Sequence, residues 1–435
     1  MNLRLLVSPL GIAMAGAALF LVVGACGSED DAAGPGPGGN GSTSSSEGSG
    51  ASTADGGSDS GGNGGTGAGS GDTCLEDPSL CGGDRPVCAL DGSCVECTPL
   101  DRSACTGNDL TCDELTNTCG PCRFHEQCPG AACNVFTGLC MTATPVTVGP
   151  DAGDDFGRID LAVDAIPTGG EGVILVKDKS TPYNRGIDVG NRTIAILAAN
   201  PATERPRVDV TQLAIDTNAF TVLSGGTLMV EGLGASSGRF GFEAQSGNLA
   251  LDRVDIRGGR ASAIIADGNA EVRLRNTIIA DHESLGGSPV PGITFGPDVV
   301  LDINFSSIAT PSSFSPAIQC EVGGNSTVTI RNSILFAGVS GANPALQDCI
   351  GVPLMVENTI ASEMIPGMGN ATFVPSSGLF EDLAGGDLRL TTAGRNQFAD
   401  QARWTDFDPR VDIDARPRPN LVDGGLDVAG AHLGP

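Results

Sequence analysis

The stretch Leu228-Met-Val-Glu-Gly-Leu233 carries the pattern that decides the fold: an apolar residue, a spacer, an apolar residue, a spacer, a small or polar residue and another apolar group. Five further copies follow it, at residues 249–254, 272–278, 301–308, 328–334 and 354–360, with starts about 21 to 29 residues apart. The alternation predicts strands and the intervening Gly, Asn, Asp and Pro predict turns. Because one strand cannot bury its apolar side alone, the copies are expected to stack into an all-β parallel β-helix, a solenoid.

Composition agrees with such a fold and excludes some functions. The chain has 435 residues, 40% of them hydrophobic, with 64 Gly but one Trp and one Tyr, which describes a core of small side chains joined by many turns. A formal net charge of −28 argues against binding to nucleic acid or to anionic lipid headgroups. The 15 cysteines predict an oxidising compartment.

The N-terminus has the features of an export signal. Arg4 is followed by an apolar run over residues 5–23 and by small residues before Cys26, so residues 1–25 are predicted to be a signal peptide. An uncleaved transmembrane helix is the alternative, because the run is nearly long enough to span a bilayer. The tetrapeptide Val23-Gly-Ala-Cys26 resembles the lipobox of bacterial lipoproteins.

That resemblance implies cleavage before Cys26, fatty acylation (palmitate) of this cysteine and anchorage to a membrane through it. Gly27 stands where such proteins often carry an aspartate that retains them in the inner membrane, so the outer membrane or cell surface is the expected location. Residues 26–72 are rich in Gly and Ser and predict a flexible tether with a reach on the order of 35–40 Å.

Residues 73–141 contain twelve cysteines and little to bury, so disulfides must hold this segment. Each of three tandem groups of four ends in a loop of similar sequence that is suited to a small hairpin. Six disulfides are expected, typically about 2–4 kcal/mol each, and their connectivity stays open. The cysteines are Cys74, Cys81, Cys88 and Cys94, then Cys97, Cys105, Cys112 and Cys119, then Cys122, Cys128, Cys133 and Cys140.

Two other interpretations of these cysteines compete with a purely structural one. Cys94-Val-Glu-Cys97 and Cys119-Gly-Pro-Cys122 have the spacing of a zinc site, and the second is also the tetrapeptide of thioredoxin active sites. Export, eight further cysteines and the position at a junction between repeats favour disulfides instead, so we predict no metal and no cofactor. The segment resembles the disulfide-rich repeats of predicted myxobacterial lipoproteins, which implies a stalk or interaction module.

The β-helix domain is predicted to span residues 150–435. A short amphipathic helix is expected over residues 156–166, capped by Asp154 or Asp155 and covering the first coil, with strands at 169–177 and 191–197. This order resembles the opening of pectin-lyase-like right-handed parallel β-helices. Residues 412–419 and 426–431 resemble the closing segment of exported β-helix repeat proteins, "DxDGxPRP…DxGAxE", with Ala415 in place of its glycine.

Two side-chain columns follow from the repeat. Cys320 and Cys349 fall at nearly the same place on adjacent coils, which predicts a disulfide; two buried thiols are the alternative. Asn276, Asn332 and Asn358 occupy equivalent positions and predict a ladder of amides at a turn, in preference to a binding site.

Candidate chemistry is sparse. A group of polar residues could line a groove, although we favour a solvated outer face for them. They are Asp252, Arg253, Asp255, Arg257, Arg260, Asp281, His282 and Glu283. Asp412 and Asp414 look like a calcium pair but fall in the closing segment, where a structural role is favoured. No catalytic residue is assigned, because no aspartate cluster recurs from coil to coil and His125, His282 and His432 lie far apart.

The sequence therefore predicts a surface-anchored lipoprotein, held on the membrane through Cys26, with a β-helix that serves as a structural or binding surface. Its expected partner is a polysaccharide or a cell-envelope protein. The alternative is a pectin-lyase-like carbohydrate-active enzyme, a polysaccharide lyase or hydrolase.

Overall fold

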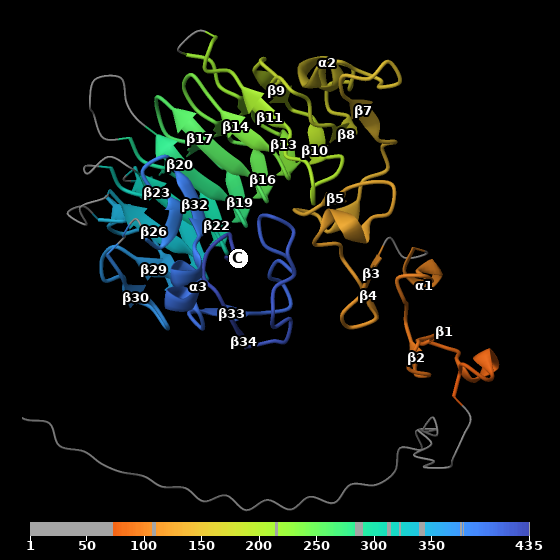
Figure 1. Cartoon of the computed structure of the whole chain (residues 1–435). Coiled ribbons are helices and arrows are strands. Elements are labelled where there is room, and N and C mark those ends of the chain that lie inside the picture. The colour runs from red at the N-terminus through yellow and green to blue at the C-terminus, as the bar shows by residue number, and fades with distance from the viewer. Residues whose placement is uncertain are drawn as a thin grey trace, which may run out of the picture. The chain divides into compact units, whose positions relative to one another are not determined.

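The computed structural model describes residues 73–434 apart from 107–109, 214–215, 283–289, 311–314, 322, 339–343, 375 and 377 (Figure 1). The predicted signal peptide, Cys26 and the tether lie outside these residues. Within them, no helix is both long and apolar enough to cross a membrane.

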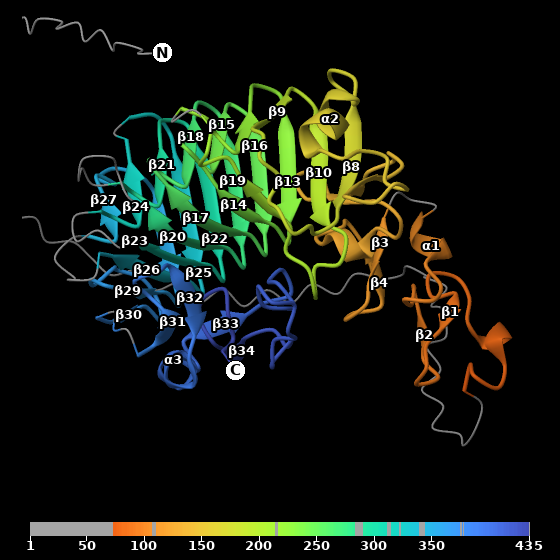
Figure 2. The same cartoon turned by 45° about the horizontal axis from the view of Figure 1, so that its top comes forward.

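Residues 146–361 form a parallel β-solenoid of about eight turns, which confirms the predicted fold class. Each coil supplies strands to three parallel sheets that run the length of the solenoid (Figure 2). The nine-stranded sheet has the order β28 (Leu354–Glu357), β25 (Thr327–Arg331), β22 (Val300–Asn304), β19 (Glu271–Arg275), β16 (Asn248–Asp252), β13 (Thr227–Glu231), β10 (Thr193–Ala198), β8 (Glu171–Val176) and β7 (Val146–Val148).

The other two sheets complete each coil. The eight-stranded sheet has the order β11 (Arg207–Asp209), β14 (Gly234–Ser236), β17 (Asp255–Gly259), β20 (Ile278–His282), β23 (Ser307–Thr310), β26 (Ile334–Ala337), β29 (Ile360–Ala361) and β30 (Ala371–Thr372). The seven-stranded sheet has the order β27 (Leu346–Gln347), β24 (Ile318–Cys320), β21 (Ile293–Phe295), β18 (Ile264–Asp267), β15 (Phe242–Gln245), β12 (Phe220–Val222) and β9 (Ile187–Gly190).

Apolar residues in register from coil to coil make the core. One column of the nine-stranded sheet is at most 1% exposed and consists of Leu228, Leu249, Val272, Leu301 and Val328. In the seven-stranded sheet, the rings of Phe220 and Phe242 stack with centroids 4.7 Å apart. The repeat therefore buries the apolar half of every strand against the coils above and below it.

The turn after the nine-stranded sheet repeats a special backbone conformation. In six successive coils the residue that follows the strand has a positive φ: Gly232, Arg253, Asn276, Phe305, Asn332 and Asn358. The hydroxyl groups one position further on form a ladder of their own: Ser306 accepts the backbone N–H of Thr277, Ser333 accepts that of Ser306, and Thr359 accepts that of Ser333.

The predicted amide ladder does not form between Asn276 and Asn332, because the coil between them carries Phe305 at this position. Asn276 instead accepts a hydrogen bond from Arg418, and Asn332 bonds Arg403 of the C-terminal segment. These asparagines tolerate the left-handed turn and also hold the chain's last segment.

A helix at the N-terminal end of the solenoid meets the expectation only in part. Helix α2 (Ile159–Asp164) is shorter than predicted, and its Ile159, Ala162 and Val163 pack on the core. The predicted capping is wrong, since Arg158 occupies the N-cap without a side-chain bond. Asp154 is taken by Lys177, at 2.6 Å, and Asp155 accepts hydrogen bonds from Thr147.

The C-terminal segment lies against the outer face of the eight-stranded sheet (Figure 1). It comprises the hairpin β31 (Phe380–Asp382) and β32 (Asp387–Leu390), helix α3 (Thr392–Phe398), and the pair β33 (Ala402–Trp404) and β34 (Gly425–Asp427). Its Phe380, Phe398 and Trp404 form a second core with Ile278 and Phe336 of the solenoid. The only tryptophan is therefore structural.

The cysteine-rich segment forms three small hairpins, as expected. They are β1 (Val87–Cys88) with β2 (Cys94–Val95), β3 (Thr111–Asp113) with β4 (Thr118–Gly120), and β5 (Cys133–Asn134) with β6 (Leu139–Cys140). Short helical turns precede them: η1 (Pro78–Leu80), α1 (Ser103–Thr106) and η2 (His125–Gln127). In every repeat the first cysteine bonds the third and the second bonds the fourth.

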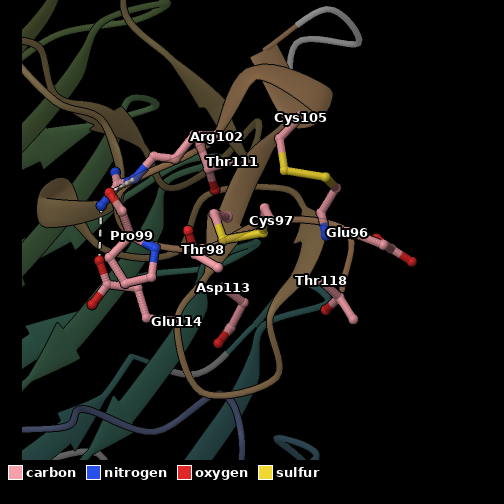
Figure 3. The surroundings of a disulfide bond; sticks show 12 residues. Glu96, Cys97, Thr98, Pro99, Arg102, Cys105, Thr111, Asp113, Glu114 and Thr118 are labelled. Carbon is pink, nitrogen blue, oxygen red and sulfur yellow. Dashed lines mark hydrogen bonds and ion pairs between the residues drawn. A yellow bond between two sulfur atoms is a disulfide. The ribbon is translucent and has the colours of Figure 1, made fainter. Parts of the chain in front are cut away.

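Figure 3 shows the second repeat, where the bonds from Cys97 and Cys105 close the loop and Arg102 reaches Glu114 at 2.8 Å. The zinc and thioredoxin interpretations fail, because Cys119 and Cys122 bond different partners in different repeats. In the solenoid, the predicted pair Cys320 and Cys349 is bonded, with Cα atoms 4.9 Å apart.

Candidate functional site

The outer face of the nine-stranded sheet changes character along the solenoid. One outward row is apolar in the first coils, with Val173, Ala195 and Met229 in register. Ala132 and Met141 of the third cysteine repeat pack on this part. The repeat therefore covers the apolar coils and reaches the first charged position of the row, where its Val135 accepts a hydrogen bond from Arg273.

From β19 to β25 both outward rows are polar. In the first row Ala250 is followed by Arg273, Asp302 and Thr329 on successive coils, and in the second Asp252 is followed by Arg275, Asn304, Arg331 and Glu357. Neighbouring strands lie about 4.8 Å apart, so these side chains form a compact charged field.

A cavity of about 180 Å³ opens over this field, and we name it the Asp302 cavity. It lies between the third cysteine repeat, strands β16, β19, β22 and β25, and the loop that carries Phe407. Its charged or ionisable lining residues are Arg123, His125, Asp252, Arg273, Arg275, Asp302 and Arg331.

The arginines of the cavity are held in place by bonds to the protein itself. Arg273 donates to the backbone oxygen of Val135 at 2.8 Å, and Arg275 donates to the backbone oxygen of Arg123 at 2.9 Å. Arg331 pairs with the buried Asp408 at 2.9 Å. Such contacts fix the guanidinium groups before any ligand arrives.

Asp302 is the exception among these charged groups. Its Oδ1 atom is buried and has no hydrogen-bond partner among the described residues. Burial raises the pKa of the Asp302 carboxyl, although Arg331, Arg273 and Arg275 act in the opposite direction. A buried acceptor without a donor costs free energy, so Asp302 presents an unused acceptor to the cavity.

Two neighbouring groups have shifted pKa values as well. Burial raises the pKa of Asp252, which pairs with Arg275 at 3.1 Å. Burial lowers the pKa of His125 to about 4, and its Nδ1 accepts the backbone N–H of Cys133. His125 is therefore neutral at neutral pH and serves the contact between repeat and sheet.

The residues singled out from the sequence separate into different roles. Asp252 lines the Asp302 cavity, whereas Arg253 is a buried turn residue that pairs with Glu126 at 3.1 Å. Asp255 and Arg257 line another cavity beside the eight-stranded sheet, and Arg260 is exposed.

Of the other candidates, Asp412 and Asp414 line neither of these cavities. Asp281 and His282 end β20, and their side chains, like residue Glu283, lie outside what the structure describes. Asp412 is fully buried and accepts the backbone N–H groups of Asp414, Arg416 and Leu433, which supports the structural role expected of the closing segment.

Arg273, Asp302 and Arg331 were missed as site residues, because each is an ordinary polar position on an alternating strand. The signal in the sequence was the register: charged residues recur outward on consecutive coils, at Arg273 and Asp302 and at Asp252 and Arg275. Phe407 carried no such signal, since its loop lies outside the repeat.

Comparison with known proteins covers only the N-terminal part. The model of a family of unknown function, DUF8331, matches residues 27–146, which include the cysteine-rich segment. No curated protein and no solved structure matches the chain.

Proposed function

We propose that this protein is a surface-anchored lipoprotein whose β-helix binds an acidic, hydroxylated saccharide in the Asp302 cavity. The observation that carries the proposal is the unpartnered, buried Oδ1 of Asp302 within a field of fixed guanidinium groups. A ligand hydroxyl would donate to this oxygen and remove the cost of leaving it unpaired.

Charge supports an acidic ligand. Four arginines line the cavity against two aspartates, while the whole chain carries a net charge of −28. The cavity is therefore a local positive site on an acidic protein, and a carboxylate matches the planar fork of a guanidinium group.

Size and shape support a sugar residue. The volume of about 180 Å³ is below the roughly 300–1,000 Å³ of pockets that enclose drug-sized ligands. Phe407 at the margin is 62% exposed, with the Arg123 guanidinium over its ring at 3.7 Å. One monosaccharide unit, or one end of a chain, fits these dimensions and this mixture of polar and apolar walls.

A carbohydrate-active enzyme is the second candidate, and it rests on the raised pKa values of Asp252 and Asp302 in one cavity. A carboxyl group with a raised pKa is what a general acid requires. The same cavity would then hold substrate, and Asp302 would transfer a proton to it.

One experiment separates the two. The purified protein, with its disulfides oxidised, is incubated with acidic and neutral polysaccharides, and both retention on the polymer and release of new chain ends are measured. Retention of an acidic polymer without new ends supports the binding module. New chain ends that disappear in Asp302→Asn support the enzyme. If the protein neither retains a polymer nor releases new ends, both candidates are contradicted.

A further inference from the structure

A second cavity, independent of the proposed function, lies beside the eight-stranded sheet. It has a volume of about 230 Å³ and is lined by Arg205, Arg207, Gly234, Asp255, Arg257 and Arg389. We name it the Arg205 cavity. Four of its six lining residues are arginines, although the chain has 24 Lys and Arg against 52 Asp and Glu.

Carboxylates neutralise part of this positive charge and fix two of the arginine side chains. Arg257 donates two hydrogen bonds to Asp255, of 2.7 and 2.9 Å. Arg389 pairs with Asp387 at 3.2 Å and with Asp414 at 3.1 Å. These carboxylates orient Arg257 and Arg389, as fixed side chains do in a preorganised site.

Arg205 and Arg207 are left with unused donors. Arg205 Nη2 donates to the backbone oxygen of Ile413, but Nη1 is buried without a hydrogen-bond partner among the described residues. Nη2 also pairs with Asp414 at 3.3 Å, whereas the Asp255 oxygen that faces Nη1 is 3.7 Å away, too far for a good hydrogen bond. The exposed side chain of Arg207 has no hydrogen bond or ion pair with any described residue.

Arg205 Nη1 is therefore an unused donor in a cavity that also holds Arg207, Arg257 and Arg389. Burial lowers the pKa of the Arg205 guanidinium, and Arg389 and Arg257 act in the same direction, whereas Asp255 and Asp414 oppose them. A buried donor left unpaired beside other cations is costly, and a multivalent oxygen acceptor would remove both costs.

We propose that the Arg205 cavity binds the tetrahedral oxyanion of a sulfate or phosphate group. Arg205 Nη1 and Arg207 donate to its oxygens, while Arg257 and Arg389 supply charge from fixed positions. Four oxygens suit donors that converge from several side chains better than the two oxygens of a carboxylate. The group is carried either by the free inorganic ion or by an ester on a polymer.

The test uses the full protein with inorganic sulfate and inorganic phosphate as probes. Thermal unfolding is followed in sodium sulfate, sodium phosphate and sodium chloride at equal ionic strength, and affinity is measured by titration calorimetry. We expect the divalent anions to raise the unfolding midpoint above its value in chloride. No difference from chloride would overturn the proposal.

Arg207→Ala is the decisive variant, because this exposed side chain supports no contact of the fold. We expect it to weaken anion binding at least tenfold. The matched control is Arg260→Ala, another exposed arginine of the solenoid that does not line the cavity. Equal binding by the two variants would overturn the proposal.

The source of the anion is resolved with a sulfated polysaccharide. Competition between this polymer and inorganic sulfate, lost in Arg207→Ala, identifies an ester-bearing polymer as ligand. Binding of the inorganic ion alone identifies the free anion. If Arg207→Ala binds the polymer as well as the native protein does, the polymer binds at another site, and this result counts against the proposal. Asp302→Asn leaves all these results unchanged, so failure here is separate from failure of the proposed saccharide site.

Discussion

The guanidinium carbon of Arg418 lies 3.8 Å from the centre of the Phe305 ring, and both side chains are buried. Phe305 occupies the left-handed turn of its coil, and Arg418 belongs to the closing segment. The same guanidinium donates to Asn276 Oδ1 at 2.8 Å and pairs with Asp427 at 3.2 Å. This arginine therefore fastens the C-terminal segment to the column of turns.

Replacing Arg418 by Met should lower the free energy of unfolding by about 3–5 kcal/mol, because Asp427 would remain buried without its partner. Urea denaturation measures the change. The double variant Arg418→Met/Asp427→Asn should recover part of it, since no unpaired charge is left. A loss below about 1 kcal/mol in the single variant, small for a broken buried ion pair, would show that the pair does not hold the segment.

Ala415 has a φ of 61°, in the left-handed region that favours glycine. Ala415→Gly should raise the free energy of unfolding by about 0.5–1 kcal/mol, since relief of backbone strain exceeds the entropy that glycine adds to the unfolded chain. Ala399, with a φ of −59°, is the matched control, and Ala399→Gly should lower stability by about 0.4–1 kcal/mol. Equal effects of the two substitutions on the unfolding midpoint would refute this interpretation.

His125 should make stability depend on pH. Burial lowers its pKa to about 4 from 6.5, so the unfolded chain binds more protons between these values. Stability is therefore complete above pH 6.5 and falls as the pH drops towards 4, by roughly 3 kcal/mol from this group. In His125→Asn, whose amide oxygen can still accept from Cys133, this part of the pH dependence should vanish. If the curves of unfolding free energy against pH were parallel for the native protein and His125→Asn, His125 would not be the source of this pH dependence.

Asp302 should cost stability in the absence of ligand. Burial raises its pKa above 3.8, so the folded state holds a proton more tightly than the unfolded chain, and stability falls as pH rises through this range. Asp302→Asn should therefore unfold at a higher temperature than the native protein at pH 7, with a smaller difference at pH 3.5. A lower unfolding temperature in the variant at pH 7 would mean that the carboxylate has a stabilising partner.

The repeat made the solenoid predictable, because alternation and spacing recur in the sequence and strands such as β19 and β22 follow them directly. The capping of α2 was not predictable, since Asp154 pairs with Lys177, which follows β8 and lies beyond the helix in the chain. Neither was the connectivity of the cysteines, because any pairing within a group satisfies the same spacing.

The Asp302 cavity was hidden for a physical reason. Arg123, Asp302 and Phe407 come from a disulfide repeat, a solenoid strand and a loop of the C-terminal segment, and only tertiary packing joins them. The sequence indicated a polar outer face, and the favoured interpretation was solvation. What distinguishes Asp302 from a solvated aspartate is the cover supplied by the other two segments.

The central claim is tested most directly by the affinity of the native protein, Asp302→Asn and Glu357→Gln for the acidic polysaccharide that the native protein retains, measured by titration calorimetry. Glu357 is the matched control, since it lies on the same sheet face but does not line the cavity. The account predicts that Asp302→Asn weakens binding about tenfold or more, as loss of a hydrogen bond to a charged group would, while Glu357→Gln binds like the native protein. Equal affinities for all three proteins would contradict it.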